Sequence, residues 1–221
     1  ATSIAENSGS TITLTATISQ AADEDVIVNL NTAGTSTNGN DYGTLTRITV
    51  SAGDLTGTVA FDPTDDSVYE GNETAVISIS SVSGADAAES GSQSVTITIT
   101  ENDSSPTITL ATSATSIAEN AGSSLTLTAT SSIAANEDIT VTISTSGTGT
   151  EGTDYSTISD ITISAGATTG TVSFTPTDDT VYEGNETGIV AISGVSGADA
   201  VESGSQSVTI TITENDSAPT V

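Results

Sequence analysis

The sequence predicts an all-β protein of two similar tandem domains, and two observations lead to that fold class. The sequence contains an internal repeat. ATSIAEN at 1–7 recurs at 114–120, and SGSQSVTITITENDS at 90–104 recurs unchanged at 203–217, an offset of 113 residues. Within each copy Thr alternates with Val, Ile and Leu, as in SVTITIT, and this period of two is typical of half-buried strands. A period of this length corresponds to a whole domain rather than to one turn of a solenoid.

Each expected strand is an alternating or β-branched run bounded by Gly, Asn, Asp or Ser. No segment of 10 residues has a helical period. In the second copy the runs lie at 107–118, 123–130, 138–145, 157–164, 168–175, 187–193 and 207–213. Seven strands in roughly 110 residues indicate an immunoglobulin-like antiparallel Greek-key sandwich.

The repeat also sets the expected domain boundaries. We predict a first domain at 1–104 with a truncated first strand, a second at 105–217, and the start of a following repeat at 218–221. The tail SAPTV (217–221) matches SSPTI (104–108), so the chain is expected to be an excerpt of a longer tandem array. Pro106 predicts a stiff junction between the domains. The tail is also the start of the strand that the first repeat lacks, so units of a polymer could complete one another.

The composition excludes several classes of function. The chain has 29 acidic residues, one basic residue (Arg47) and a net charge of -28, which disfavours nucleic acids and anionic membranes and suits cations. It has no Cys, His or Lys, so disulfides, thiolate catalysis, Cys-ligated zinc and Lys isopeptide cross-links are excluded. No apolar run reaches the roughly 18 residues of a membrane span. Paired carboxylates occur in glycoside hydrolases, but no general base lies near a Ser or Thr, so we expect no enzyme.

A dense acidic motif points to a metal site. PTDDSVYEGNET (63–74) recurs as PTDDTVYEGNET (176–187), and further acids lie at other predicted strand ends. Carboxylates about 4 Å apart repel by about 1 kcal/mol in water and by more in a protein, and a divalent cation removes that conflict. Oxygen ligands without His or Cys favour Ca²⁺ over zinc, and Mg²⁺ prefers to keep its waters. The candidate ligands are Glu6, Asp41, Asp65, Asp66, Glu70, Glu73, Glu101 and Asp103, and in the second copy Glu119, Asp154, Asp178, Asp179, Glu183, Glu186, Glu214 and Asp216.

The alternative interpretation is a solvated acidic loop that keeps the chain soluble. It suits Asp23–Asp25 better, because that run shortens to Glu137 and Asp138 in the second copy. Arg47 is left out of the site because Asp160 takes its position.

Taken together, the acidic motifs resemble the Calx-beta domain. They are an early Glu6, Gly34 to Tyr42 in a G-T-x-x-x-G-x-D-Y pattern, the D-D-x-x-x-E-x-x-E of 65–73, and the acidic strand end at 101–103, each repeated 113 residues later. The resemblance implies a seven-stranded immunoglobulin-like sandwich with Ca²⁺ at the loops near the next domain. It assigns as ligands Glu6, Asp41, Asp65, Asp66, Glu70 and Asp103, with Glu73 and Glu101 as further candidates. Asn102 and Asn215 replace an aspartate at the strand end, which implies fewer or weaker ions. Cadherin-like repeats would need an Asp-Arg-Glu motif, which this sequence does not contain.

The expected function is a calcium-binding structural repeat of an extracellular, secreted bacterial adhesin or surface filament, with ions that stiffen the junction between domains. The alternative is a calcium-dependent ligand-binding or sensing module, cadherin-like or exchanger-like. Expected partners are neighbouring repeats and a cell-surface or matrix target, with neither nucleic acid nor membrane insertion of this segment.

Overall fold

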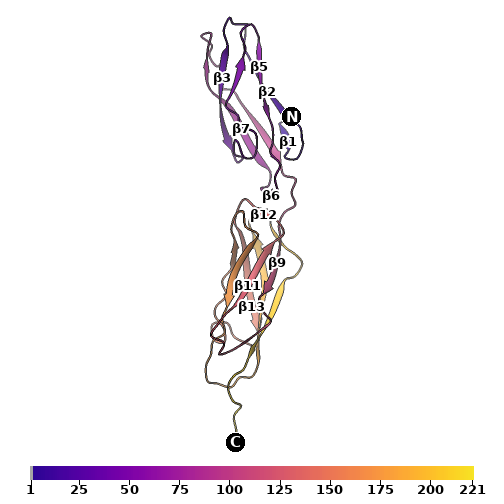
Figure 1. Ribbon diagram of the computed structural model, residues 1–221, viewed down its shortest axis with the longest axis vertical. Coiled ribbons are helices and arrows are strands. Elements are labelled where there is room, and N and C mark those ends of the chain that lie inside the picture. The colour runs from indigo at the N-terminus through magenta and orange to yellow at the C-terminus, as the bar shows by residue number, and fades with distance from the viewer. Residues whose placement is uncertain (1) are drawn as a thin grey trace. The chain divides into compact units, whose positions relative to one another are not determined.

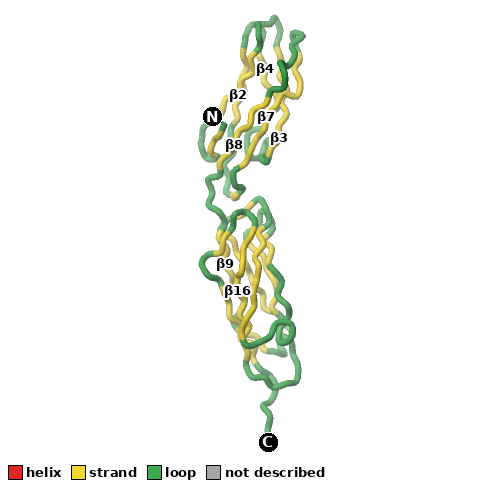
Figure 2. The backbone as a smooth tube through the Cα atoms, turned by 180° about the vertical axis from the view of Figure 1, so that it is seen from behind, coloured by secondary structure: helices red, strands yellow, loops and turns green. Residues whose placement is uncertain are grey.

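The structure is a computed structural model that describes residues 2–221. It divides into two compact units: the first runs to Asp66 and includes Gly71–Asn102, and the second comprises Ser67–Glu70 and Asp103–Val221. All regular elements in the described residues are strands (Figures 1 and 2). Accordingly, nothing in residues 2–221 forms a helix long and apolar enough to cross a membrane. The predicted all-β class is confirmed.

The second unit is a sandwich of two sheets. One sheet has the order β10-β18-β16-β13-β14 and the other the order β15-β11-β9-β17. The strands are β9 (Thr107–Thr112), β10 (Ser116–Ala118), β11 (Leu125–Ser131), β12 (Ala134–Ala135), β13 (Ile139–Gly147), β14 (Ile161–Ile163), β15 (Thr169–Phe174), β16 (Glu186–Ser196), β17 (Val201–Glu202) and β18 (Ser207–Thr213).

Alternation along the strands builds the core of this unit. In β18, Ile210 and Ile212 are buried while the alternating Thr residues lie on the other face. Tyr155 and Phe174 stack with ring centroids 4.7 Å apart. A Cβ at Gly188 would lie 2.8 Å from the Phe174 ring, so this glycine lets β16 approach the stack. The buried apolar residues of the unit form one continuous cluster.

Two details of the predicted strands are wrong. The expected strand 107–118 is two strands, because β9 pairs with β11 in one sheet whereas β10 pairs with β18 in the other. The expectation of purely antiparallel pairing also fails, since β10–β18 and β17–β9 are parallel. The split and the parallel β10–β18 pairing have one cause: the chain crosses between the sheets after β9 and continues beside β18.

The first unit repeats the larger sheet, with the order β1-β8-β7-β3-β4, and has a two-stranded sheet of β2 and β5. Its buried residues form two separate clusters, one around Phe61 and Ile97 and one around Val26 and Val50. The strands are β1 (Ser3–Ala5), β2 (Ile12–Thr17), β3 (Val26–Gly34), β4 (Arg47–Val50), β5 (Thr56–Phe61), β7 (Glu73–Ser83) and β8 (Ser94–Thr100).

Ser67–Glu70, from the acidic loop of the first repeat, belong to the second unit. There β6 (Val68–Tyr69) pairs in parallel with β12, and the Asn136 N–H donates to the Tyr69 carbonyl at 3.1 Å. The Tyr69 side chain packs against the core of this unit, and its hydroxyl donates to Asp199 Oδ2 at 2.9 Å. The loop therefore has a packing role as well as an acidic one.

Candidate metal centre

Strand pairing gathers acidic residues at one end of the second unit. Glu119 follows β10, whose Ala118 is the partner of Thr213 at the end of β18, and the Glu119 N–H donates to the Thr213 carbonyl at 3.0 Å. Glu214 continues from β18, and Glu186 begins β16 opposite Ile212. Three strand ends therefore place their carboxylates together.

Two loops bring further acids to the same end. The loop between β13 and β14 is tied to Pro176 through Tyr155, and the Thr177 N–H donates to the Asp154 carbonyl at 3.0 Å. The following acidic loop is held by the Glu214 carboxylate, whose Oε2 accepts the N–H groups of Glu183 at 2.7 Å and Gly184 at 2.9 Å.

The result is three overlapping carboxylate groups, each with oxygens within 4.8 Å of one another. Glu119 belongs to two of them and Glu183 to two, so the groups form one continuous acidic surface. The only basic side chain of the sequence, Arg47, belongs to the first unit and contributes no charge to these groups. The groups are Glu119, Glu214 and Asp216; Glu119, Asp179 and Glu183; and Asp154, Glu183 and Glu186.

Crowding makes several of these acids hard to ionise. Burial, together with the charges of Asp154 and Glu183, raises the pKa of Glu186 to about 7. The pKa of Glu119 is also raised, mainly by burial, and the charges of Glu214 and Asp179 act in the same direction while the Asp179 N–H opposes them. Such shifts mean that the ionised form of the site lacks compensating positive charge.

The pKa of Glu214 is shifted in the opposite direction. Backbone N–H groups of Asp216, Glu183 and Gly184 donate to its carboxylate and lower its pKa to about 2. Glu214 therefore stays ionised and holds the acidic loop against the end of β18.

The carboxylate of Asp216 is a further indication of a cation site. Its Oδ2 is buried and has no hydrogen-bond partner among the described residues 2–221. Burial also raises the pKa of Asp216, as do the charges of Glu214 and Asp178. A buried polar oxygen without a partner is costly, and a cation would satisfy it. The donor set is made of carboxylate oxygens, which suit a hard cation such as Ca²⁺.

In the first unit, Asp41 and Glu73 also bring carboxylate oxygens within 4.8 Å of each other, whereas the predicted ligand Glu70 belongs to the second unit. Glu73 and Glu6 are 8% and 6% exposed, which is unusual for acids. Glu101 accepts the Gly71 N–H at 2.9 Å and so repeats the loop-holding contact of Glu214. The remaining predicted ligands lie outside the carboxylate groups, and their metal role stays a prediction: Glu6, Asp65, Asp66, Glu101, Asp103 and Asp178.

Sequence reasoning missed three residues that shape these sites. Asn185 Oδ1 accepts the Glu214 N–H at 3.0 Å, and Asn72 Oδ1 accepts the Glu101 N–H at 3.0 Å. Glu151 accepts the Ile158 N–H and the Thr145 hydroxyl at 2.6 Å each, which braces the loop that carries Asp154. The signal for the asparagines was their recurrence in both copies.

Comparison with protein families gives a match to the Calx-beta domain over residues 1–103 and again over residues 101–216. The comparison with curated proteins found no match.

Among solved structures, CBD12 from CALX1.2 matches with 14% identity and a TM-score of 0.40, covering 96% of each chain. The calcium binding domain CBD12 of CALX1.1 matches with 15% identity and a TM-score of 0.38, over 87% of this chain and 77% of that one. The adhesin InvE of Yersinia pseudotuberculosis matches with 12% identity and a TM-score of 0.40, over 96% of this chain and 56% of that one.

Proposed function

This chain belongs to the Calx-beta domain family, and from that premise we propose that it is a calcium-binding structural repeat of an extracellular adhesin or surface filament. The observation that carries the proposal is the merged set of carboxylates at the end of β18, with raised pKa values and no base beside them. The role is non-catalytic, and the ligand is Ca²⁺.

The carboxylates of the second unit supply enough oxygens for more than one ion. Ca²⁺ takes six to eight oxygen ligands, and three overlapping groups that share Glu119 and Glu183 suit neighbouring ions with bridging carboxylates. Backbone carbonyls and waters complete the shell. Ions held there bind Glu214 and Asp216 to the acidic loop, and thereby restrict the segment that leaves β18.

The segment after each last strand is the natural place for mechanical stiffening. The sequence ENDS follows both β8 and β18, and in each case its first acid holds the loop that contains the EGNET motif. We propose that bound ions limit bending at this segment and raise the resistance of the repeats to unfolding. Neighbouring repeats and a cell-surface or matrix target are the proposed partners.

A thermal melt tests the calcium proposal directly. At free Ca²⁺ about 100-fold above Kd, one site adds about 2.7 kcal/mol, which for a unit of this size is a Tm increase of about 10 °C. The melt is measured in EDTA, in millimolar Ca²⁺ and in millimolar Mg²⁺ as the matched control. Identical melts in all three solutions would show that the carboxylates are only a solvated surface.

A further inference from the structure

Two threonine hydroxyls connect two parts of the carboxylate site in the second unit. Thr148 lies just after β13, and Thr187 is the second residue of β16. The Thr187 N–H donates to Thr148 Oγ1 at 2.9 Å, and the Thr148 N–H donates to Thr187 Oγ1 at 3.2 Å. The two hydroxyl oxygens lie 3.3 Å apart, so one hydroxyl donates to the other. Each side chain therefore accepts the backbone N–H of the other residue, and we call this arrangement the hydroxyl pair.

The hydroxyl pair continues the contact between β13 and β16 beyond the end of their ladder. Gly147 and Gly188 are the last register partners of the two strands. Gly147 has a φ of +122°, and a Cβ there would lie 2.1 Å from the Thr187 carbonyl oxygen, so glycine is needed for the chain to turn this close to β16. The Gly149 N–H then donates to the same carbonyl at 3.1 Å. Side-chain and backbone hydrogen bonds thus bind the start of the loop to β16.

This attachment sets the spacing of two carboxylates. Glu186 immediately precedes Thr187, and Asp154 lies further along the attached loop. The Thr150 N–H donates to Asp154 Oδ2 at 2.6 Å, which fixes the Asp154 side chain to the same stretch of the loop. Asp154 and Glu186 belong to one carboxylate group, with oxygens within 4.8 Å of each other. A Cβ at Gly149 would lie 3.4 Å from Glu186 Oε2, so the loop passes directly beside that carboxylate.

The first unit contains the same arrangement. The Thr74 N–H donates to Thr35 Oγ1 at 2.8 Å, the Thr35 N–H donates to Thr74 Oγ1 at 3.4 Å, and the two hydroxyl oxygens lie 3.4 Å apart. Thr74 follows Glu73, and the carboxylate oxygens of Asp41 and Glu73 again lie within 4.8 Å of each other. The hydroxyl pair therefore accompanies the close carboxylates in both units, although the cores of the two units differ.

The hydroxyl pair acts against the repulsion between these carboxylates. Like charges this close repel one another in the absence of a cation, and a free loop would relieve the repulsion by moving away from β16. A loop that is already held loses less freedom when an ion binds, so more of the interaction energy contributes to affinity. Hydroxyls suit this role because they are neutral and add no charge to the carboxylate group.

We propose that Thr148 and Thr187 are positioning residues for the calcium site: their hydroxyl pair holds Asp154 and Glu186 at a ligand spacing that favours Ca²⁺ over Mg²⁺. The inference rests on the calcium function proposed above and adds the residues that control its ion selectivity. Ca²⁺ takes six to eight oxygens, so its affinity depends on several ligands being in place, whereas Mg²⁺ keeps several waters and takes one or two carboxylates. Hydrogen-bond partners that orient metal ligands typically contribute about 10–100-fold to metal affinity.

Titration of Ca²⁺ into the whole chain and into Thr148→Val tests the proposal, followed by NMR at the Gly149 amide with a chelator as the competitor. Val keeps the shape of Thr and lacks the hydroxyl, and Thr148 is exposed, so the fold should be retained. We expect Ca²⁺ affinity at this site to fall about tenfold or more, and Mg²⁺ affinity to fall much less. Thr187→Val should act in the same way, and Thr148→Ser, which keeps a hydroxyl, should retain the affinity.

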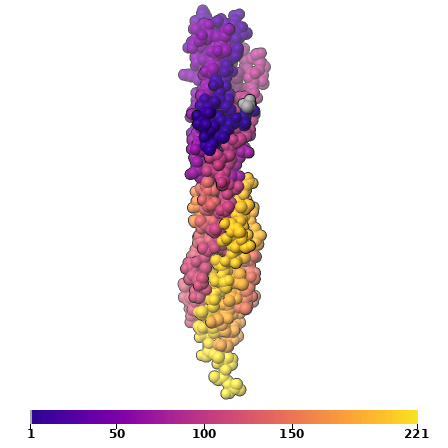
Figure 3. All heavy atoms as spheres, turned by 90° about the vertical axis from the view of Figure 1, so that its right-hand side faces the viewer, coloured from indigo at the N-terminus to yellow at the C-terminus, as the bar shows by residue number. Residues whose placement is uncertain are grey.

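The matched control is Thr209→Val. It makes the same change at an exposed position of β18, a strand whose atoms are among the yellow ones at the surface in Figure 3. Because Thr209 has no part in the hydroxyl pair, its replacement should leave the affinities for both ions unchanged.

Hydrogen exchange in EDTA tests the hydroxyl pair without any metal. In Thr148→Val the Gly149 amide should exchange faster than in the parent chain, because the loop is released although the acceptor of this amide, the Thr187 carbonyl, is unchanged. Unchanged exchange at Gly149, equal losses of Ca²⁺ and Mg²⁺ affinity, or an equal effect of Thr209→Val would overturn the proposal. A Thr148→Val chain that does not fold in EDTA would also overturn it, since the hydroxyl pair would then serve the fold and not the site. A parent chain that binds no Ca²⁺ would overturn the proposed function and this inference together, whereas Ca²⁺ affinity unchanged by Thr148→Val would overturn this inference alone.

Discussion

At the scale of single residues, Glu119 belongs to two of the carboxylate groups at once. It is 7% exposed, it accepts the Asp179 N–H at 3.2 Å, and it lies beside Glu214, Asp216 and Glu183. In the absence of a cation its charge opposes folding, whereas with Ca²⁺ the same charge supplies a shared ligand. Its two effects on stability should therefore have opposite signs.

Glu119→Gln separates these two effects. Gln keeps an oxygen for the Asp179 N–H but removes the charge, so we expect a gain of about 1 kcal/mol in the free energy of unfolding in EDTA. Calcium affinity of the second unit should fall about tenfold or more, because charge count sets affinity at oxygen sites. Calorimetric titration and melts of the two proteins measure both effects. Asp54→Asn, an exposed acid outside the carboxylate groups, is the matched control, and a loss of stability in EDTA would contradict the argument.

The raised pKa of Glu186 predicts a pH dependence in EDTA. Its pKa is about 7 in the folded chain against 4.5 ordinarily, so the folded state holds a proton that the unfolded state releases between these values. That contribution is fully present below about pH 4.5 and is lost as pH rises through 7. Glu214, with a pKa of about 2, contributes stability above pH 4.5 and is constant from pH 5 to 8. The Tm in EDTA should therefore fall from pH 5 to 8, and Glu186→Gln should flatten the curve; a rise would contradict the assignment.

At the scale of elements, β9 joins the two halves of the second core. Ile108 is fully buried and belongs to the same cluster as Ile210 and Val141. Ile108→Ala should lower the free energy of unfolding of the second unit by about 2–5 kcal/mol. Denaturant unfolding followed by NMR resolves the two units, and the first unit should be unchanged because Ile108 packs in the core of the second unit. Thr107→Ala, at an exposed position of the same strand, is the control; an equal loss there would show that β9 acts through its backbone alone.

The same element shows what the sequence could and could not predict. The alternation of polar and apolar residues located the strands, because one face of each sheet is buried. For 207–213 the predicted bounds are those of β18. It could not show that 107–118 changes sheets at Ser113–Thr115, because the alternation is the same in both sheets and no Gly or Pro marks the crossing. The parallel β10–β18 pairing depends on that crossing.

The candidate site could likewise be predicted from the sequence only in part. Sequence reasoning placed acids at strand ends and chose the residues that the structure brings together, including Glu119, Asp154, Glu183, Glu186 and Glu214. It could not separate Asp179, which joins a group, from its neighbour Asp178, which does not, because loop geometry decides between adjacent residues. Sequence reasoning also could not show that Ser67–Glu70 pack in the second unit, because the sequence of that loop is nearly the same in both copies.

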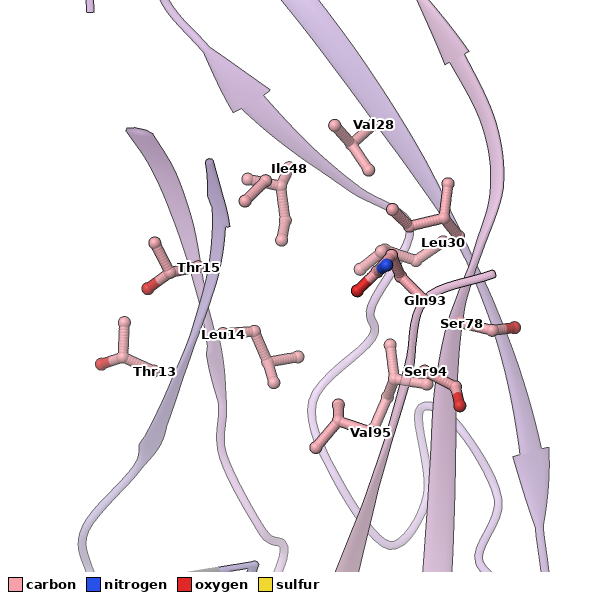
Figure 4. Close-up of a pocket in the computed structure, with 13 residues that line it drawn as sticks. Thr13, Leu14, Thr15, Val28, Leu30, Ile48, Ser78, Gln93, Ser94 and Val95 are labelled. Carbon is pink, nitrogen blue, oxygen red and sulfur yellow. The ribbon is translucent and has the colours of Figure 1, made fainter. Parts of the chain in front are cut away.

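At the scale of the whole molecule, two similar sequences form units whose cores differ in continuity. β8 and β18 have the same sequence, SVTITIT, and each lies between its neighbours in the larger sheet. These two strands therefore have equal local propensity, and any difference between them comes from packing. The buried residues of the second unit form one cluster, whereas those of the first form two clusters that are both contacted by the partly buried Leu14 and Leu30 (Figure 4).

The first unit should consequently unfold before the second. We expect two transitions in calcium-free denaturant, with the Leu14 amide of β2 exchanging hydrogen faster than the Leu127 amide of β11, because opening of a region depends on its buried contacts. Hydrogen exchange is measured by NMR, because mass spectrometry cannot distinguish peptides from β8 and β18, which have the same sequence. A single transition with equal protection at the two leucines would contradict the link between the two separate buried clusters and a lower stability of the first unit.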